Sequence, residues 1–399
     1  MSALRPVARD AAVLAAGSYA ALGFSFAGTI LIARALGPEG RGLYAWLLTL
    51  VFLAVQLATL APAQAVRAVV AKRGGVPPGL PAGLVLLGLG GSLLGLPVMA
   101  YAALDPDLGS RAAPYLGPAF ATVPLAAATL CLQGVLVASG RVARFAAAQI
   151  LPRLLQFAAI LVLSARGELD LLHAVWLGPA AIGLELLLTA AAIGPRVVAE
   201  RPRLAELSPV LRRLVDGWLA AFGLFLLPRI GLLALGASGG TAVAGQYSVA
   251  LTLQEVAGLA PAALGGVLIT RAGTLPGSGR AGLVALAVAA AVLLAGWSLA
   301  PLLVPLVFGA DYRDAAFLLQ PLLCGTLLFT GFQLLQPVLW RDRRSGAPAA
   351  PAVLAAAIAC LVAFGAVPRY GTLGAVASNL AGFAVLAGTA FLLARTARS

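Results

Sequence analysis

Four charged side chains lie inside long apolar runs of the sequence: Arg153, Glu185, Arg229 and Glu255. A charge at the centre of a lipid-facing helix costs about 2.5 to 3.5 kcal/mol on insertion scales, so each should face a bundle interior, either paired or hydrated. A guanidinium shielded from bulk water binds a phosphate through two parallel hydrogen bonds, and a carboxylate nearby can be its counter-charge or a coupling group. The residue types indicate either a polar site that faces a substrate or ion pairs buried between helices.

Arg229 is the residue that most needs a partner, because it lies in the middle of the apolar run FGLFLLPRIGLLALG, residues 222–236. Along a helix it is about 20 Å from Asp216 at one end and about 10 Å from Gly236 at the other. Pro228 removes a backbone donor and permits a bend, as at transporter sites. We expect Arg229 to face a substrate; the alternatives are a buried ion pair and a side chain that reaches outward to the interface.

Arg153 has polar neighbours at helical spacing. Gln149, Arg153 and Gln156 follow an i, i+4, i+7 pattern, so they share one helix face. Such a stripe on an apolar helix indicates the wall of a wet cavity, and the alternative is a seam of hydrogen bonds between helices.

The two carboxylates are interpreted differently. Glu255 aligns with Gln56 when the sequence is shifted by 199 residues, so both halves place a polar side chain at the same depth. We expect Glu255 either to line a cavity or to neutralise an arginine. For Glu185, which has only Thr189 at i+4, we expect a structural role.

The elements that position these residues are membrane-spanning helices. The chain has 399 residues, of which 61% are hydrophobic and 10% charged, and a mean hydropathy of +1.00, which predicts an all-α polytopic membrane protein. Each span needs about 20 apolar residues. Twelve segments qualify: 11–33, 43–65, 80–103, 114–138, 145–164, 171–193, 215–236, 244–269, 281–308, 315–339, 347–366 and 372–394.

Loop charges set the expected orientation. With the N-terminus inside, the inner loops and termini carry about three times as many Lys and Arg as the outer loops, which predicts that both termini are cytoplasmic. Because the basic residues lie in short loops rather than on one surface, the net charge of +13 does not indicate nucleic-acid binding.

A weak internal repeat divides the chain. The 199-residue shift sets ALGPEG, residues 35–40, over ALGASG, residues 234–239, and LAPA over LAPA. We therefore expect two six-helix lobes, 1–194 and 217–399, joined by a cytoplasmic linker over 195–216. Lobes of equal orientation are related by a pseudo-twofold axis along the membrane normal, as in alternating-access carriers.

The sequence contains little that indicates an enzyme. GASGG, residues 236–240, fits the G-x-S-x-G pattern, but the only histidine, His173, is expected at the start of another span. No phosphate-binding loop occurs, and the three cysteines lie in apolar segments. We expect no catalytic activity, no cofactor and no metal.

Several stretches resemble the multidrug/oligosaccharidyl-lipid/polysaccharide (MOP) flippase superfamily, in particular its bacterial polysaccharide and O-antigen flippase branch. They are ILIARALGPEGRGLYAWLLTL, GQYSVALTLQEVAGLAPAALGGVL and VPRYGTLGAVASNLAGF. The second resembles the family's eighth span through Tyr247, Ala250 and Glu255. One departure is that Arg229 is followed by Ile230 and Gly231 where the family often has Arg-x-Asp, so a sodium or proton site at that position is in doubt.

The resemblance implies a MATE-like fold in a bacterial cytoplasmic membrane and export of a polyprenyl-diphosphate-linked oligosaccharide for cell-surface polysaccharide synthesis. The expected partners are this lipid-linked substrate, membrane lipids and polysaccharide polymerase or assembly proteins. On this interpretation Arg229 and Arg153 bind the headgroup, and Glu255 is the counter-charge or coupling group. The residues expected to bind sugar hydroxyls are Gln56, Gln149 and Gln156. Two rivals are a cation-coupled MATE-like exporter and a nontransporting scaffold of a polysaccharide assembly complex.

Overall fold

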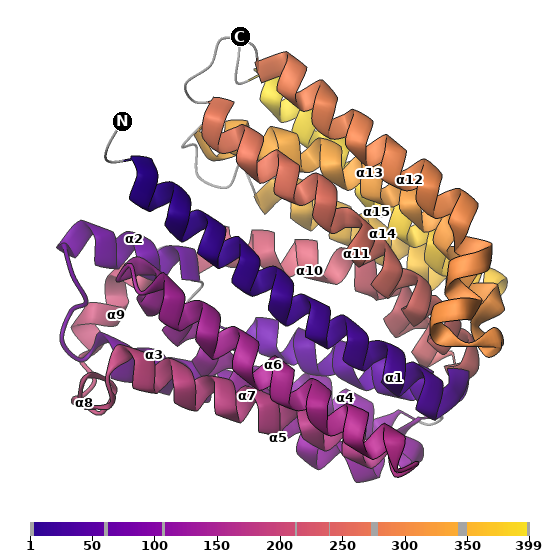
Figure 1. Ribbon diagram of the computed structural model, residues 1–399, viewed down its shortest axis with the longest axis horizontal. Helices are drawn as coiled ribbons and strands as arrows, with labels where there is room; N and C mark the ends of the chain where they lie inside the picture. Colours follow the sequence, from indigo (N-terminus) through magenta and orange to yellow (C-terminus); the bar gives the residue numbers. More distant parts are fainter. Residues whose placement is uncertain are drawn as a thin grey trace. The chain divides into compact units, whose positions relative to one another are not determined.

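The computed structural model describes residues 4–59, 63–105, 108–211, 214–238, 240–272, 278–341 and 349–396. Helices make up the regular structure throughout these ranges (Figure 1). Ten of the described helices are long and apolar enough to cross a membrane. The chain is an all-helical, multi-pass membrane protein, as the composition predicts.

The chain forms two compact units. Unit 1 comprises 1–36 and 47–218, and unit 2 comprises 37–46 and 219–399. The expected lobes, 1–194 and 217–399, remain a prediction.

The first expected span and most of the second lie on one long helix, α1 (Leu4–Ala58), on either side of a kink at Gly37. Gly37 has a φ of 65° and is followed by Pro38, so glycine supplies the left-handed conformation at the bend. The second expected span was drawn too long: α1 ends at Ala58, and α2 (Ala63–Arg73) is a separate helix. Residues 60–62 lie outside the described ranges.

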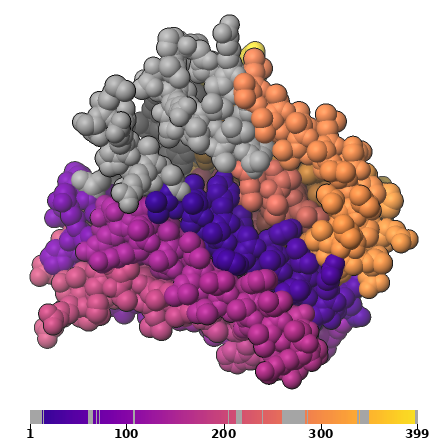
Figure 2. Space-filling model, viewed as in Figure 1, coloured from indigo at the N-terminus to yellow at the C-terminus, as the bar shows by residue number. Residues whose placement is uncertain are grey.

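Unit 1 is built from α1 without its residues 37–46, from α2 and from the helices that follow as far as residue 218. These are α3 (Leu80–Gly91), η1 (Ser92–Gly95), α4 (Leu96–Leu104), α5 (Gly109–Ala138), α6 (Val142–Ala165), α7 (Leu171–Ile193), α8 (Pro195–Val198) and α9 (Leu204–Leu211). The first part of α1 and α6 lie side by side on the face seen in Figure 2. Phe24 and Phe157 meet there with ring centroids 6.0 Å apart, and a Cβ on Gly17 would press on Ala146.

The segment expected to be a linker is folded over 195–211. α9 packs on α2 and α3, and its Leu207 and Val210 are buried in the core of unit 1. Arg73 forms an ion pair with Glu206 at 3.1 Å, and the Gly79 N–H donates to Glu200 Oε2 at 2.7 Å. This short amphipathic stretch therefore closes one end of unit 1.

Unit 2 contains residues 37–46 of α1, which begin at its kink, and most of α10, together with the helices that follow α10. They are α10 (Leu214–Ala237), α11 (Thr241–Ala272), α12 (Ser278–Phe308), η2 (Ala310–Tyr312), α13 (Arg313–Arg341), α14 (Ala349–Tyr370) and α15 (Thr372–Thr396). Its core includes Leu227, Phe332 and Leu386. Helix α11 packs on α12, α13 and α15, and this arrangement positions one of the charged residues discussed below.

Candidate functional site

Arg229 on α10 forms an ion pair with Glu255 on α11. Arg229 Nη2 lies 2.6 Å from Glu255 Oε1, and the two side chains are 23% and 44% exposed. Both residues lie well within the lengths of their helices rather than at the ends. Since a charge inside a span is costly, the pair gives each of them a partner.

The guanidinium of Arg229 is also held by its own helix. Nη1 donates to the carbonyl oxygen of Phe225 at 3.4 Å, and the guanidinium carbon lies 4.5 Å from the centre of the Phe225 ring. A cation over an aromatic face is attracted by the ring quadrupole. Contacts with residue 225 therefore restrain the arginine in addition to its pairing with Glu255.

A buried pair of amides fixes α11 next to Glu255. Gln254 Nε2 donates to the carbonyl oxygen of Leu322 on α13 at 2.7 Å and to Asn379 Oδ1 on α15 at 3.2 Å. Gln254 and Asn379 are only 4% and 1% exposed. A Cβ on Gly325 would come within 2.9 Å of both amides, so glycine makes room for them. Because successive residues of a helix point about 100° apart, anchoring Gln254 also fixes the direction of Glu255.

Unit 1 holds a second ion pair. Arg153 Nη2 on α6 lies 3.1 Å from Glu185 Oε2 on α7, and Gln133 Nε2 on α5 donates to Glu185 Oε1 at 2.8 Å. Arg153 Nη1 donates to Gln156 Oε1 at 3.1 Å. The Glu185 side chain is buried, with 8% exposed. This network links three helices of unit 1.

The other residues expected at the site have different surroundings. Gln149 lies 3.5 Å from the Ser18 hydroxyl, at the upper limit of a hydrogen bond. The backbone carbonyl of Gln56, rather than its side chain, accepts a hydrogen bond from Trp218 Nε1 at 2.8 Å. Within the units, the structure thus brings Arg229 to Glu255 and Arg153 to Gln156.

Sequence reasoning missed three residues of these networks: Gln133, Gln254 and Asn379. Each of the three is an uncharged amide within an apolar segment of the sequence. Such a residue is less unusual in a membrane span than a charged one, so the sequence pattern did not single it out. Among the described residues, no group of three or more His, Cys, Asp or Glu is placed to hold a metal ion.

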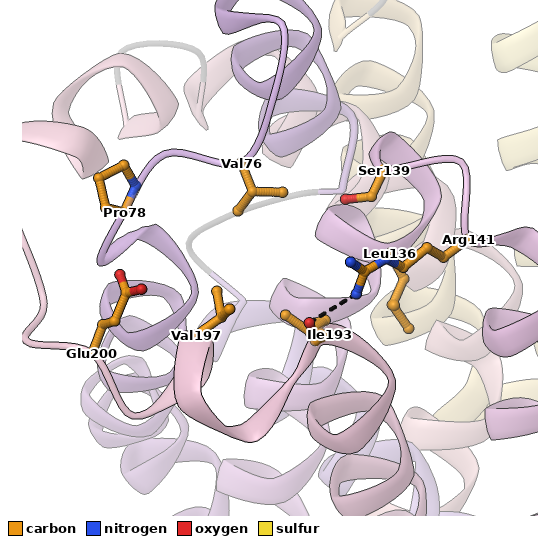
Figure 3. Close-up of a pocket in the computed structure, with 8 residues that line it drawn as sticks. All are labelled: Val76, Pro78, Leu136, Ser139, Arg141, Ile193, Val197 and Glu200. Carbon is orange, nitrogen blue, oxygen red and sulfur yellow. Dashed lines mark hydrogen bonds between the residues drawn. The ribbon is translucent and has the colours of Figure 1, made fainter.

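A pocket of about 220 Å³ lies elsewhere in unit 1, at the ends of α5 and α7 (Figure 3). Arg141 and Glu200 contribute charges on opposite sides of it. Arg141 Nη1 donates to the carbonyl oxygens of Ala192 and Ile193 at 2.9 and 2.8 Å, and therefore caps the last turn of α7. The lining of this pocket contains none of the expected site residues.

Comparisons with known proteins identify the fold. No family model and no curated protein sequence matches the chain. Among solved structures, the lipid II flippase MurJ in an inward closed conformation aligns with a TM-score of 0.65 at 12% identity, over 95% of this chain and 88% of that chain. An inward-facing multidrug resistance MATE family transporter of the MOP superfamily aligns with a TM-score of 0.59 at 16% identity, over 94% and 93%.

A MOP superfamily transporter from Pyrococcus furiosus also aligns, with a TM-score of 0.55 at 16% identity, over 98% of this chain and 95% of that chain. At such low sequence identities the similarity establishes the fold alone. The aligned region covers most of this chain and most of each of these structures. The chain has the MATE-like fold of MOP-superfamily transporters.

Proposed function

We propose that this protein is an alternating-access flippase that moves a polyprenyl-diphosphate-linked oligosaccharide across a bacterial cytoplasmic membrane for cell-surface polysaccharide synthesis. Arg229, held on α10 with part of its side chain accessible, is the observation that carries the proposal. A guanidinium has five donors in a planar fork, which suits a diphosphate. An accessible charge inside a span is expected to face water or a ligand rather than lipid.

The fold supports transport by alternating access. Structures similar to this chain include both an inward-facing and an outward-facing MATE family transporter of the MOP superfamily. The flippase branch is supported by the three sequence stretches described above, and the lipid II flippase of the same fold is one example of a protein that moves a lipid-linked substrate. In this proposal the lobes are 1–194 and 217–399, and both termini are cytoplasmic.

The roles of the remaining site residues follow from their chemistry. Glu255 balances Arg229 when no substrate is bound, and Arg153 supplies a second cation for the headgroup. Gln56, Gln149 and Gln156 are proposed to bind sugar hydroxyls, which amides can do as donors and acceptors. Membrane lipids and polysaccharide polymerase or assembly proteins are the proposed partners.

A cation-coupled MATE-like exporter is the second candidate. Its support is the structural likeness to multidrug transporters and the half-exposed carboxylate of Glu255. The Pyrococcus furiosus structure is described as having a "reverse polarity of binding pocket" that "suggests different function". That description means that pocket polarity differs between proteins of this fold, so the headgroup charge of the substrate must be tested directly. A nontransporting scaffold is the remaining alternative.

The test is transbilayer movement of a fluorescent polyprenyl-diphosphate oligosaccharide in proteoliposomes. Wild type, Arg229→Ala and Arg229→Lys are compared at equal amounts of folded protein, with Arg369→Ala, an exposed arginine of unit 2, as the matched control. We expect movement by wild type and by the control, strong loss in Arg229→Ala and partial activity in Arg229→Lys. Export of a cationic dye without movement of the lipid would favour the MATE-like exporter, and movement of neither would favour the scaffold.

A further inference from the structure

The carboxylate of Glu255 occupies the position on Arg229 that a substrate phosphate needs. Both groups present oxygen acceptors to the same guanidinium, and the 2.6 Å distance to Nη2 is that of a short, charge-assisted contact. Any anion that binds Arg229 through this nitrogen therefore has to displace Glu255. Glu255 is an internal competitor of the proposed substrate.

The surroundings allow the carboxylate to leave while the arginine stays. The contacts of Arg229 with the Phe225 carbonyl and ring do not involve Glu255. Glu255 is the more exposed partner, with 44% of its side chain accessible against 23% for Arg229. The backbone of α11, in contrast, is anchored beside it through Gln254. A displaced Glu255 side chain therefore stays within reach of Arg229.

Among the described salt bridges, Arg229 is the cation that Glu255 contacts. On α10, α11, α12, α13 and α15 the other charged residues lie near helix ends: Asp216, Arg271, Arg280, Arg313, Asp314, Arg341 and Arg395. In the described parts of these helices, Arg229 is therefore the mid-helix arginine with which a displaced Glu255 can pair again.

We propose that Glu255 promotes release of the substrate. After the substrate has crossed the membrane, Glu255 forms its ion pair with Arg229 again and so displaces the phosphate headgroup. The proposal rests on the proposed function and adds to it a step that limits affinity and speeds turnover. No covalent bond forms or breaks, because one anion replaces another on the guanidinium. A tethered competitor acts at a high effective concentration, so it lowers the apparent affinity by the fraction of time for which it occupies Arg229.

The proposal predicts that loss of the Glu255 charge changes binding affinity and turnover rate in opposite directions. Replacing Glu255 with an uncharged isostere removes the competitor while Arg229 remains in place, so the headgroup should bind more tightly and dissociate more slowly. A carrier that releases its cargo slowly has a lower maximal rate. A purely structural role for Glu255 would instead lower affinity and rate together.

The experiment measures binding and dissociation of the fluorescent polyprenyl-diphosphate oligosaccharide on full-length protein in detergent, and its movement in proteoliposomes. For Glu255→Gln we expect affinity to rise about tenfold, which corresponds to the loss of an ion pair of about 1.4 kcal/mol, with a slower off-rate and a reduced maximal rate. Asp314→Asn, an exposed carboxylate of unit 2, is the control and should match wild type.

Glu255→Asp provides a second, independent variant, since it keeps the charge but shortens the side chain by one methylene. It should bind more tightly than wild type and less tightly than Glu255→Gln. Unchanged or weaker binding in both variants, with wild type binding the lipid, would overturn the release role and leave the proposed function standing. If wild type and Arg229→Ala bind the lipid equally poorly, the proposed function itself fails.

Discussion

Arg153 and Glu185 form the counterpart, within unit 1, of the ion pair of unit 2, but their carboxylate is held from two sides. Glu185 Oε2 lies 3.1 Å from Arg153 Nη2, and Oε1 accepts the Gln133 amide at 2.8 Å. The Glu185 side chain is 8% exposed, against 44% for Glu255. A carboxylate with both oxygens engaged and little access is suited to joining helices, whereas the accessible one is suited to exchange.

We predict that Glu185→Leu destabilises the protein through the loss of this junction. Removing one partner leaves the other charge uncompensated, and because Arg153 is partly accessible the cost should be about 1 to 3 kcal/mol rather than that of a fully buried pair. Reversible unfolding in mixed micelles measures it. The double variant Arg153→Leu/Glu185→Leu should be less destabilised than the sum of the single variants. Strict additivity would mean that the two charges do not interact.

A second prediction concerns the buried amides of unit 2. Gln254→Leu removes the hydrogen bonds between Gln254 and Asn379 in a position that is almost fully buried, so it should cost about 1 to 2 kcal/mol of stability. It should also impair transport, because α11 then no longer fixes the direction of Glu255. The same unfolding assay is used together with the proteoliposome assay.

Changing both amides separates packing from hydrogen bonding. Gln254→Leu/Asn379→Leu removes both polar groups, so stability should recover toward that of wild type while transport remains impaired. Full transport in the double variant would show that the amides do not position Glu255.

The sequence predicted the helices better than the contacts between them. Apolar runs identify spans because hydropathy and length are local properties. Most expected spans fall on a single helix, whereas the span 80–103 covers α3, η1 and α4. The end of the second span was missed at Ala58 because the residues that follow are also apolar. Charged candidates were found because a charge in a span is rare. The pairing of Arg153 with Glu185 was not predicted, since it joins different helices and no spacing along the chain reports on it.

Close packing around the kink of α1 gives a third prediction. In unit 2 a Cβ on Gly42 would overlap the carbonyl oxygen of Thr241, and a Cβ on Gly245 would overlap that of Pro38. Both obstacles are backbone atoms, which cannot rotate away. Gly42→Ala should therefore separate these segments and lower the melting temperature in detergent.

Gly388→Ala is the matched control for this prediction, because a Cβ there would meet nothing within 4 Å. In the middle of α15, alanine is favoured over glycine by about 1 kcal/mol, so the control should be neutral or slightly more stable. Equal melting temperatures for Gly42→Ala and Gly388→Ala would contradict the close backbone contact.

The N-terminus of α7 provides a prediction on pH dependence. Asp170 caps this helix: its side chain accepts the backbone N–H of His173 at 2.8 Å and contacts His173 Nδ1 at 2.8 Å. The hydrogen bond from the His173 backbone is the main cause that holds the pKa of Asp170 below its ordinary value of 3.8. A carboxylate with a lowered pKa stabilises the folded state above its ordinary pKa, and the contribution is lost as the pH falls through the lowered value.

Asp170→Ala should therefore reduce stability at pH 6 by up to about 1 kcal/mol, a modest amount because the cap is largely exposed. The difference from wild type should shrink as the pH is lowered below 3.8, since wild type then loses the same charged cap. Asp170→Asn can still accept the His173 N–H, so it should stay near wild type at pH 6 while losing this pH dependence. Melting temperatures of the three proteins between pH 6 and pH 3 measure both effects, and a constant gap between wild type and Asp170→Ala across this range would contradict the lowered pKa.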